Sequence, residues 1–180
     1  MSTQTLPERT GITTFQGNPM TLVGHAVAVG DAAPDFFVVD ASMKPITLND
    51  VTAGGTRAAL LIAVPSLDTP VCNIESRRFN ERLAEFPKGV SAYVISMDLP
   101  FAQKRWCGDD GEIALGMLSD YRERSFGHSY GVFVKELALL ARATFVVSAD
   151  KKITYSEITA DIAQEPNYDA AVAAALAAAK

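Results

Sequence analysis

The sequence is poor in the residues that build metal sites and disulfide frameworks. Its 180 residues include two cysteines, Cys72 and Cys107, and two histidines, His25 and His128. The histidines do not show ligand spacing with either cysteine, so no metal site is expected. Two cysteines in a reducing compartment are more typical of catalytic or redox-active thiols than of a permanent cross-link.

The sequence also lacks long apolar runs and an excess of positive charge. No apolar run is long enough to span a bilayer. The polar segment Met1 to Thr10 lacks the basic and apolar regions of a signal peptide, so a cytoplasmic location is expected. The net charge is −5 and the 16 Lys and Arg residues are scattered, which argues against nucleic acid or an anionic membrane as a partner.

The stretch from Pro65 to Cys72 separates two contrasting patterns. Before it, the continuous apolar run from Ala58 to Val64 predicts a fully buried central strand. After it, residues recur at helical spacing, at positions Cys72, Ser76, Phe79, Leu83 and Phe86. One cysteine therefore lies where a strand gives way to a helix.

The residues just before Cys72 predict that it lies in the first turn of this helix. Asp68 or Thr69 can cap the helix, and Pro70 suits its first turn, where a missing N–H costs nothing. The unpaired N–H groups and the dipole of a first turn favour the thiolate, which is the nucleophilic form of cysteine. From position alone, an activated cysteine and a small core side chain are about equally good interpretations.

The middle of the chain predicts a βαβ unit. Residues 91–96 form a second apolar strand, parallel to the strand 58–64, with the Cys72 helix as the crossover. A short helix is expected next, with Asp98 as its cap, Pro100 in its first turn and Gly108 at its end.

The N-terminal part is expected to begin with a flexible segment over residues 1–12. A small β-hairpin follows, with strands at 13–16 and 20–22 around the turn 17–19. We expect residues 13–180 to form a single domain, since no linker, repeat or boundary is visible.

The C-terminal part predicts an antiparallel hairpin and a final helix. Strands are expected at 143–148 and 152–156. Residues 168–178 are almost all alanine, so this helix must lie close against its neighbour. The fold class is therefore α/β, with a central mixed sheet flanked by helices.

Several motifs resemble those of a known enzyme family. Pro65, Thr69 and Cys72 form the pattern P-x-x-x-T-x-x-C, which resembles the active-site signature of peroxiredoxins. The longer runs PSLDTPVC, RRFN and DLPFAQKRWCG, with LARA and EPNY further on, resemble bacterial thiol peroxidases, which are atypical two-cysteine peroxiredoxins. This resemblance implies a thioredoxin-like fold with an added N-terminal β-hairpin, a homodimer and no metal, flavin or haem cofactor.

The resemblance also implies a role for each candidate residue. Cys72 attacks a hydroperoxide and becomes a sulfenic acid, Cys107 resolves it as an intramolecular disulfide, and thioredoxin restores both thiols. Thr69 places its hydroxyl near the sulfur and the peroxide, although it could be only a helix cap. Arg142 favours the thiolate and holds the peroxide oxygens, although a lone arginine is usually solvated. Pro65 shields the pocket from water, although it could simply end the strand.

One other class of function uses the same sulfur chemistry. A peroxide-sensing redox switch or binding module would form the same disulfide without turnover. The combination of Thr69, Arg142 and Pro65 favours the enzyme, because a slow sensor does not require it. The sequence therefore predicts a thioredoxin-dependent peroxidase.

Overall fold

The computed structural model describes residues 5–108 and 113–180, so residues 1–4 of the expected flexible segment lie outside the described residues. Across this part of the chain, the central sheet has seven strands in the order β13-β12-β7-β8-β9-β5-β6. Strands β7, β8 and β9 are parallel, and the other pairings are antiparallel, so the predicted mixed sheet is confirmed. The strands are β5 (Phe37–Asp40), β6 (Pro45–Thr47), β7 (Ala58–Ala63), β8 (Val90–Ser96), β9 (Gly116–Ser119), β12 (Ala143–Ser148) and β13 (Ile153–Ile158).

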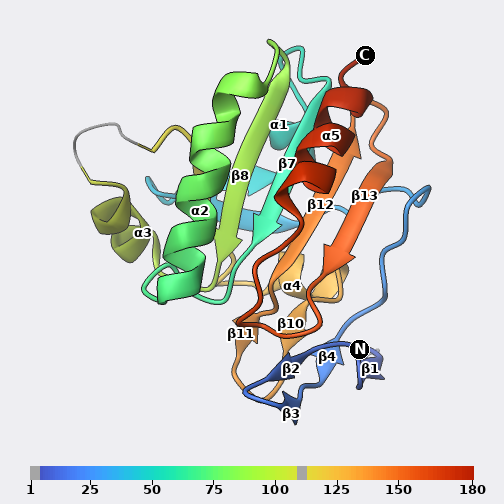
Figure 1. Cartoon of the computed structure of the whole chain (residues 1–180), viewed down its shortest axis with the longest axis vertical. Helices are drawn as coiled ribbons and strands as arrows, with labels where there is room; N and C mark the ends of the chain where they lie inside the picture. The colour runs from blue at the N-terminus through green and yellow to red at the C-terminus, as the bar shows by residue number, and fades with distance from the viewer. Residues whose placement is uncertain (1–4, 109–112) are drawn as a thin grey trace.

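Helices cover both faces of this sheet (Figure 1). Helices α2 and α5 lie on one face, α1 and α4 on the other, and α3 packs beside β9. Strand β7, helix α2 and strand β8 form the predicted βαβ unit. The helices are α1 (Leu48–Val51), α2 (Pro70–Arg82), α3 (Pro100–Cys107), α4 (Ser125–Ser129) and α5 (Tyr168–Ala178), and the 3-10 turn η1 (Leu83–Glu85) extends α2.

A second, smaller sheet lies at the end of the molecule where α2 begins (Figure 1). Its strands come from the N-terminal region and from the segment before β12. The order is β1 (Glu8–Arg9), β4 (Leu22–Val23), β10 (Phe133–Val134) and β11 (Leu139–Leu140). Strand β1 lies inside the segment 1–12 for which flexibility was expected. Arg9 holds this strand in place by donating hydrogen bonds to the carbonyl oxygens of Gly24 and Gly131.

The N-terminal hairpin is present, but its second strand lies at Asn18–Pro19 and not at the predicted residues 20–22. Strand β2 (Thr14–Phe15) pairs with β3 (Asn18–Pro19), and the turn between them is Gln16-Gly17. Both turn residues have positive φ, 52° and 80°, the geometry that suits a two-residue hairpin turn. Leu22 instead belongs to β4, where it pairs with Arg9 of β1 and Val134 of β10, and its side chain is fully buried in the core.

The hydrophobic core forms one layer on each face of the central sheet. Along β7, Ala59 and Leu61 belong to one layer, whereas Leu60 and Ile62 belong to the other. Both faces of β7 are thus covered, which explains the continuous apolar run in its sequence. Because the two layers draw on residues from Met20 to Ala179, we propose that residues 13–180 form a single domain.

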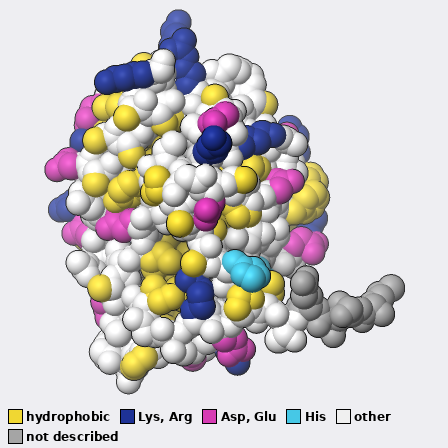
Figure 2. All heavy atoms as spheres, turned by 90° about the vertical axis from the view of Figure 1, so that its right-hand side faces the viewer, with side chains coloured by type: hydrophobic (Ala, Val, Ile, Leu, Met, Phe, Trp, Pro, Cys, Tyr) yellow, Lys and Arg dark blue, Asp and Glu magenta, His cyan; other side chains and the backbone are white. Residues whose placement is uncertain are grey.

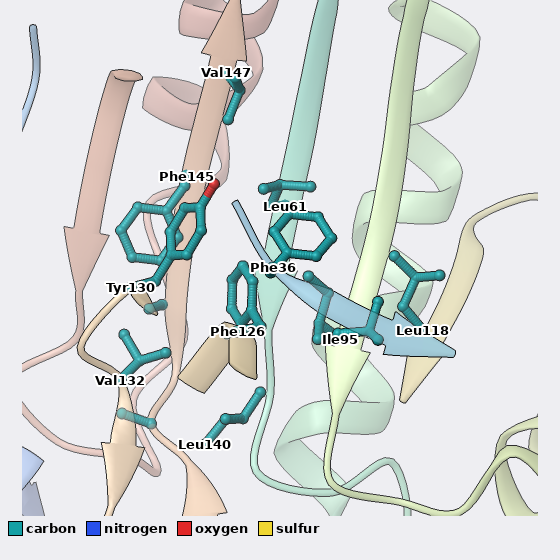
Figure 3. Close-up of a cluster of buried hydrophobic side chains, with 14 of the residues drawn as sticks. Phe36, Leu61, Ile95, Leu118, Phe126, Tyr130, Val132, Leu140, Phe145 and Val147 are labelled. Carbon is teal, nitrogen blue, oxygen red and sulfur yellow. The ribbon is translucent and has the colours of Figure 1, made fainter. Parts of the chain in front are cut away.

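Aromatic rings fill the layer beneath α4. Figure 3 shows Phe36, Phe126, Tyr130 and Phe145 grouped over one face of β12 and β7. The rings of Phe126 and Tyr130 are stacked, with centroids 4.4 Å apart, and Phe36 meets Phe126 edge-on at 5.5 Å. This layer packs on the face of the sheet opposite α2, so β7 is supported on the side away from the helix.

The surface carries both signs of charge. On the face shown in Figure 2, basic and acidic side chains are interspersed, as their scattering in the sequence predicts. None of the described helices is long and apolar enough to cross a membrane.

Helix α5 packs directly on the sheet, as its alanine content predicts. Ala171 and Ala175 are fully buried, and the helix contacts β12, β7 and β13. Small side chains let the helix backbone approach these strands closely, so no space remains for a larger residue on this face.

We predict that Ala175→Leu destabilises the protein, because the added atoms must displace the sheet or the helix. The expected loss is about 1–3 kcal/mol in the free energy of unfolding, measured by urea denaturation. Ala173, on the exposed face of the same helix, is the matched control. Ala173→Leu should change the value by less than about 0.5 kcal/mol. Equal effects of the two substitutions would contradict close packing of α5.

Candidate active site

Cys72 lies in the first turn of α2, at the carboxyl end of β7, as predicted. The helix begins at Pro70, and Thr69 precedes it with extended backbone angles. The Cys72 side chain is fully buried, in the same apolar layer as Leu67 and Phe79. The sulfur therefore lies in apolar surroundings, where a charged partner interacts with it strongly.

Arg142 supplies that partner. Its Nη2 donates to Cys72 Sγ at 3.3 Å, and its Nε donates to the carbonyl oxygen of Ile162 at 2.8 Å. The side chain is 1% exposed, so the interpretation of Arg142 as a solvated surface residue is wrong. Because β12 pairs with β7, the residue just before β12 is carried beside the start of α2.

Glu75 completes this buried group, and sequence reasoning missed it. Its carboxylate pairs with Nη1 of Arg142, and both side chains are almost completely buried. Glu75 follows Cys72 by three positions on α2, so both lie on one face of the helix. The sequence did contain a signal for this residue. Glu75 is a charged residue at a position that the helical spacing places on the buried face of the predicted helix.

Burial and neighbouring charges act in opposite directions on the pKa values of Glu75 and Arg142. Burial raises the pKa of Glu75 to about 8, against the opposing effect of Arg142. Burial also disfavours the Arg142 charge, but Glu75 and Cys72 outweigh it and raise the pKa of Arg142. The fixed charge of the group is that of Arg142, because a guanidinium is not deprotonated in proteins. The positive charge of Arg142 thus faces two acidic groups, the carboxyl of Glu75 and the thiol of Cys72.

Thr69 is the N-cap residue of α2, one of the two predicted caps, but its side chain makes no capping hydrogen bond. Its hydroxyl donates instead to the carbonyl oxygen of Ser66 at 3.0 Å, within the loop that leads into the helix. The backbone carbonyl of Thr69 accepts the first helical bond from Asn73. The hydroxyl oxygen keeps its lone pairs for another donor.

Pro65, Thr69 and Arg142 line one cavity, which brings these predicted residues together. The cavity has a volume of about 330 Å³ and its lining is almost entirely apolar. The remaining lining residues are Phe15, Pro70, Val71, Leu137, Leu139, Ile162 and Ala163. Arg142 therefore joins the cavity to the Cys72 sulfur.

The N-terminal hairpin contributes to this cavity, a role that its sequence did not reveal. Phe15 of β2 is one wall, and the neighbouring Thr14 fixes the hairpin to the segment after β13. The Thr14 amide donates to Ala160 at 3.0 Å, and the Ile162 amide donates to Thr14 at 2.8 Å. The Thr14 hydroxyl also donates to the carboxylate of Asp161.

Cys107 lies in the last turn of α3, as predicted. Gly108 ends the helix with φ of 69°, and Cys107 is half-buried against the same apolar layer that contains Cys72. Neither cysteine is in a disulfide. Burial raises the pKa of the Cys107 thiol. The adjacent Trp106 also borders this layer, and the guanidinium of Arg77 lies 5.6 Å from the centre of its ring.

The structure corrects the predicted N-cap of α3. Leu99, not Asp98, is the N-cap of α3. The carboxylate of Asp98 turns away from α3 and accepts hydrogen bonds from Ser66 and Leu67. The ring of His128 packs against Phe133, with centroids 4.7 Å apart. Within residues 5–108 and 113–180, no group of His, Cys, Asp and Glu side chains is arranged to hold a metal ion.

The comparison with protein families agrees with this geometry. Residues 29–156 match the model of the AhpC/TSA family. The chain belongs to the AhpC/TSA family. It is 48% identical to a thiol peroxidase of Clostridium acetobutylicum, over 91% of this chain and 97% of that protein. It is 45% identical to a thiol peroxidase of Bacillus subtilis, over 93% and 98% of the two chains.

A solved structure extends the similarity to the fold. The crystal structure of a peroxiredoxin-like protein from Aquifex aeolicus superposes with a TM-score of 0.82 at 39% identity, over 97% of this chain and 99% of that chain. The protein is thus a peroxiredoxin enzyme with a thioredoxin-like fold, which confirms the predicted family and fold class.

We predict that Glu75→Ala strongly destabilises this peroxiredoxin, because it leaves the buried Arg142 charge without its carboxylate. The expected loss is about 3–5 kcal/mol in the free energy of unfolding. Glu8, which pairs with Lys135 on the surface, is the matched control. Glu8→Ala should cost at most about 1 kcal/mol in the same urea titration. A loss at Glu75 as small as that at Glu8 would show that Arg142 does not depend on the pair.

Proposed function

We propose that this peroxiredoxin reduces hydrogen peroxide and organic hydroperoxides by means of Cys72, with Cys107 as the resolving thiol. The observation that carries the proposal is the contact of Arg142 with Cys72 Sγ at 3.3 Å, beside an apolar cavity that Thr69 and Pro65 also line. Thioredoxin, or a similar dithiol protein in a reducing cytoplasmic compartment, is the proposed reductant.

The proposed cycle has three steps. The Cys72 thiolate attacks one peroxide oxygen, the O–O bond breaks, and the other oxygen leaves as alkoxide or hydroxide, which takes up a proton to become alcohol or water. The Cys107 thiolate then attacks the sulfur of the Cys72 sulfenic acid. An S–S bond forms, the S–O bond breaks, and the oxygen leaves as hydroxide, which takes up a proton to become water. Finally, the dithiol reductant is oxidised and both thiols are restored.

The residues around Cys72 can assist the first step. Arg142 stabilises the thiolate and can donate to the oxygen that acquires negative charge. The Thr69 hydroxyl, already bonded to Ser66, can accept a hydrogen bond from the peroxide. Pro65 has no N–H to hydrate and adds an apolar wall, which keeps competing water from the sulfur.

The second step requires movement. A disulfide needs its two Cα atoms within about 7 Å. Cys72 is held in the first turn of α2 by Arg142, whereas Cys107 lies at the end of another helix. We propose that the start of α2, α3 or both unwind locally, and that α3 is the weaker element because it is short.

We also propose that the enzyme forms a homodimer at the active-site end. Exposed apolar side chains near the starts of α2 and α3 support this location. Ile74 is 44% exposed, Leu99 is 49% exposed and Phe101 is 66% exposed.

The central test is peroxide-dependent NADPH consumption through thioredoxin and its reductase. We predict that Cys72→Ser abolishes turnover, because a serine hydroxyl does not ionise near neutral pH. Thr69→Val and Arg142→Ala should each slow the reaction with peroxide at least about tenfold, or about 1.4 kcal/mol of barrier. Substantial turnover of Cys72→Ser would contradict the assignment. Oxidation of wild type without turnover would instead favour a redox switch.

The apolar cavity supports selection of organic hydroperoxides. We predict that Phe15→Ala lowers kcat/KM for cumene hydroperoxide about tenfold while changing that for hydrogen peroxide less than about twofold, since only the organic substrate contacts the ring. Phe37, which is 43% exposed on β5, is the control residue. Phe37→Ala should leave both values unchanged. Equal losses for the two substrates in Phe15→Ala would exclude this role for the hairpin.

The raised pKa of Cys107 predicts a pH-dependent second step. Its thiol is mostly protonated at neutral pH, so disulfide formation should accelerate with rising pH, by about tenfold per unit while the pH stays below the pKa. Stopped-flow Trp106 fluorescence after one equivalent of peroxide measures this step. Cys107→Ser, which cannot form the disulfide, provides the baseline. A rate independent of pH between 6 and 8 would mean that the movement, not the thiolate fraction, limits resolution.

A further inference from the structure

The carboxylate of Asp98 connects two parts of the molecule that are far apart in sequence. Asp98 lies between β8 and α3. Its Oδ1 accepts a hydrogen bond from Ser66 Oγ at 2.8 Å, and its Oδ2 accepts one from the Leu67 amide at 2.8 Å. Oδ2 also accepts a bond from Ser96 Oγ at 2.8 Å. Three donors from two segments thus converge on one side chain.

On one side, these bonds hold the loop that precedes Cys72. Ser66 and Leu67 belong to the segment between β7 and α2, and Leu67 is almost fully buried. The carbonyl oxygen of Ser66 accepts bonds from the hydroxyl of Thr69 at 3.0 Å and from its amide at 3.1 Å. Asp98 therefore fixes the peptide that orients the Thr69 hydroxyl beside the cavity.

On the other side, the bonds continue into the helix that carries Cys107. Gln103 of α3 donates from Nε2 to Ser96 Oγ at 3.1 Å and to the Leu118 carbonyl at 2.8 Å. Gln103 is fully buried. It lies four positions before Cys107, so both residues lie on the same side of α3. Asp98 and Ser96 thus link the Cys72 loop to the buried anchor of α3.

We propose that Asp98 is a positioning residue that couples the two halves of the catalytic cycle. It holds Thr69 in place for the reaction of Cys72 with peroxide, and it retains α3 until Cys72 has been oxidised. No hydrogen bond joins Asp98 to the Cys72 sulfur, so its effect passes through Ser66 on one side and through Ser96 to Gln103 on the other. The inference rests on the proposed function, because it requires Cys107 to resolve the Cys72 sulfenic acid.

The coupling predicts opposite effects on the two steps. Removing the carboxylate frees the Ser66 peptide, so the Thr69 hydroxyl is less well placed and sulfenic acid formation slows. The same change weakens the attachment of α3, so Cys107 reaches the oxidised sulfur sooner and disulfide formation accelerates. A residue that merely supports the fold would slow both steps or neither.

The conservative variant should restore both rates. In Asp98→Asn, Nδ2 can take the place of Oδ1 and donate to Ser66 Oγ, since a hydroxyl can accept as well as donate. Oδ1 of the amide can then accept from the Leu67 amide and from Ser96 Oγ. The network keeps its shape without its negative charge.

The experiment is rapid mixing of the reduced full-length protein with one equivalent of hydrogen peroxide, followed by alkylation and mass spectrometry of Cys72. For Asp98→Ala we expect sulfenic acid formation to be about fivefold slower and disulfide formation about threefold faster than in wild type. Asp98→Asn should stay within about twofold of wild type in both steps. Equal slowing of both steps, or wild-type rates in Asp98→Ala, would overturn the proposal.

Two further variants keep the result interpretable. Asp40 accepts bonds from the amides of Ser42 and Lys44 in the turn between β5 and β6, and it is the matched control. Asp40→Ala should leave both rates unchanged, and the proposal fails if it reproduces the Asp98→Ala pattern. If Asp98→Ala does not fold, Ser66→Ala removes one of the three bonds. It should then slow the first step and accelerate the second, and any other pattern overturns the proposal.

Wild type separates this inference from the proposed function. If oxidised wild type contains no Cys72–Cys107 disulfide, the proposed function fails and the inference fails with it. If the disulfide forms but Asp98→Ala behaves as wild type, the inference alone fails.

Discussion

The buried contact between Arg142, Glu75 and Cys72 is the interaction on which the site depends. A guanidinium is costly to bury, so it requires acceptors on every side that has no water. Glu75, the carbonyl oxygen of Ile162 and the Cys72 sulfur supply them. These acceptors come from α2 and from the segment after β13, so the contacts of Arg142 connect the helix that carries Cys72 to the sheet.

The apolar layers around this contact give it its strength. Cys72 lies in the layer between α2, α5 and the sheet, and the aromatic layer on the opposite face keeps β7 rigid. In such surroundings one positive charge acts on the sulfur with little screening by water. The cavity beside it has the same apolar character, and one of its walls is Phe15, from a hairpin near the start of the chain.

The first two steps of the proposed cycle place opposite demands on the packing around Cys72. The proposed reaction with peroxide needs Cys72 held beside Arg142 and Thr69, whereas the proposed disulfide needs Cys107 brought to the same sulfur. The short α3, bounded by Pro100 and Gly108, is the element that can yield at low cost. In the proposed cycle, the hydrogen bonds that Ser96 donates to Asp98 and accepts from Gln103 determine how firmly α3 is held until that moment.

Local patterns in the sequence determined much of this protein. The apolar run before Pro65 predicted the central strand, Pro70 predicted the first turn that contains Cys72, and the alanines of 168–178 predicted α5 with its observed bounds. Each of these signals acts within one element, through backbone propensity and burial. Only the tertiary structure decided which side chains meet. Glu75 and Arg142 are 67 positions apart, and Ser66 and Asp98 are 32 positions apart. Local rules also assigned Asp98 to a helix cap, but Ser66 and Leu67, which only the folded sheet brings near, form hydrogen bonds with its carboxylate instead.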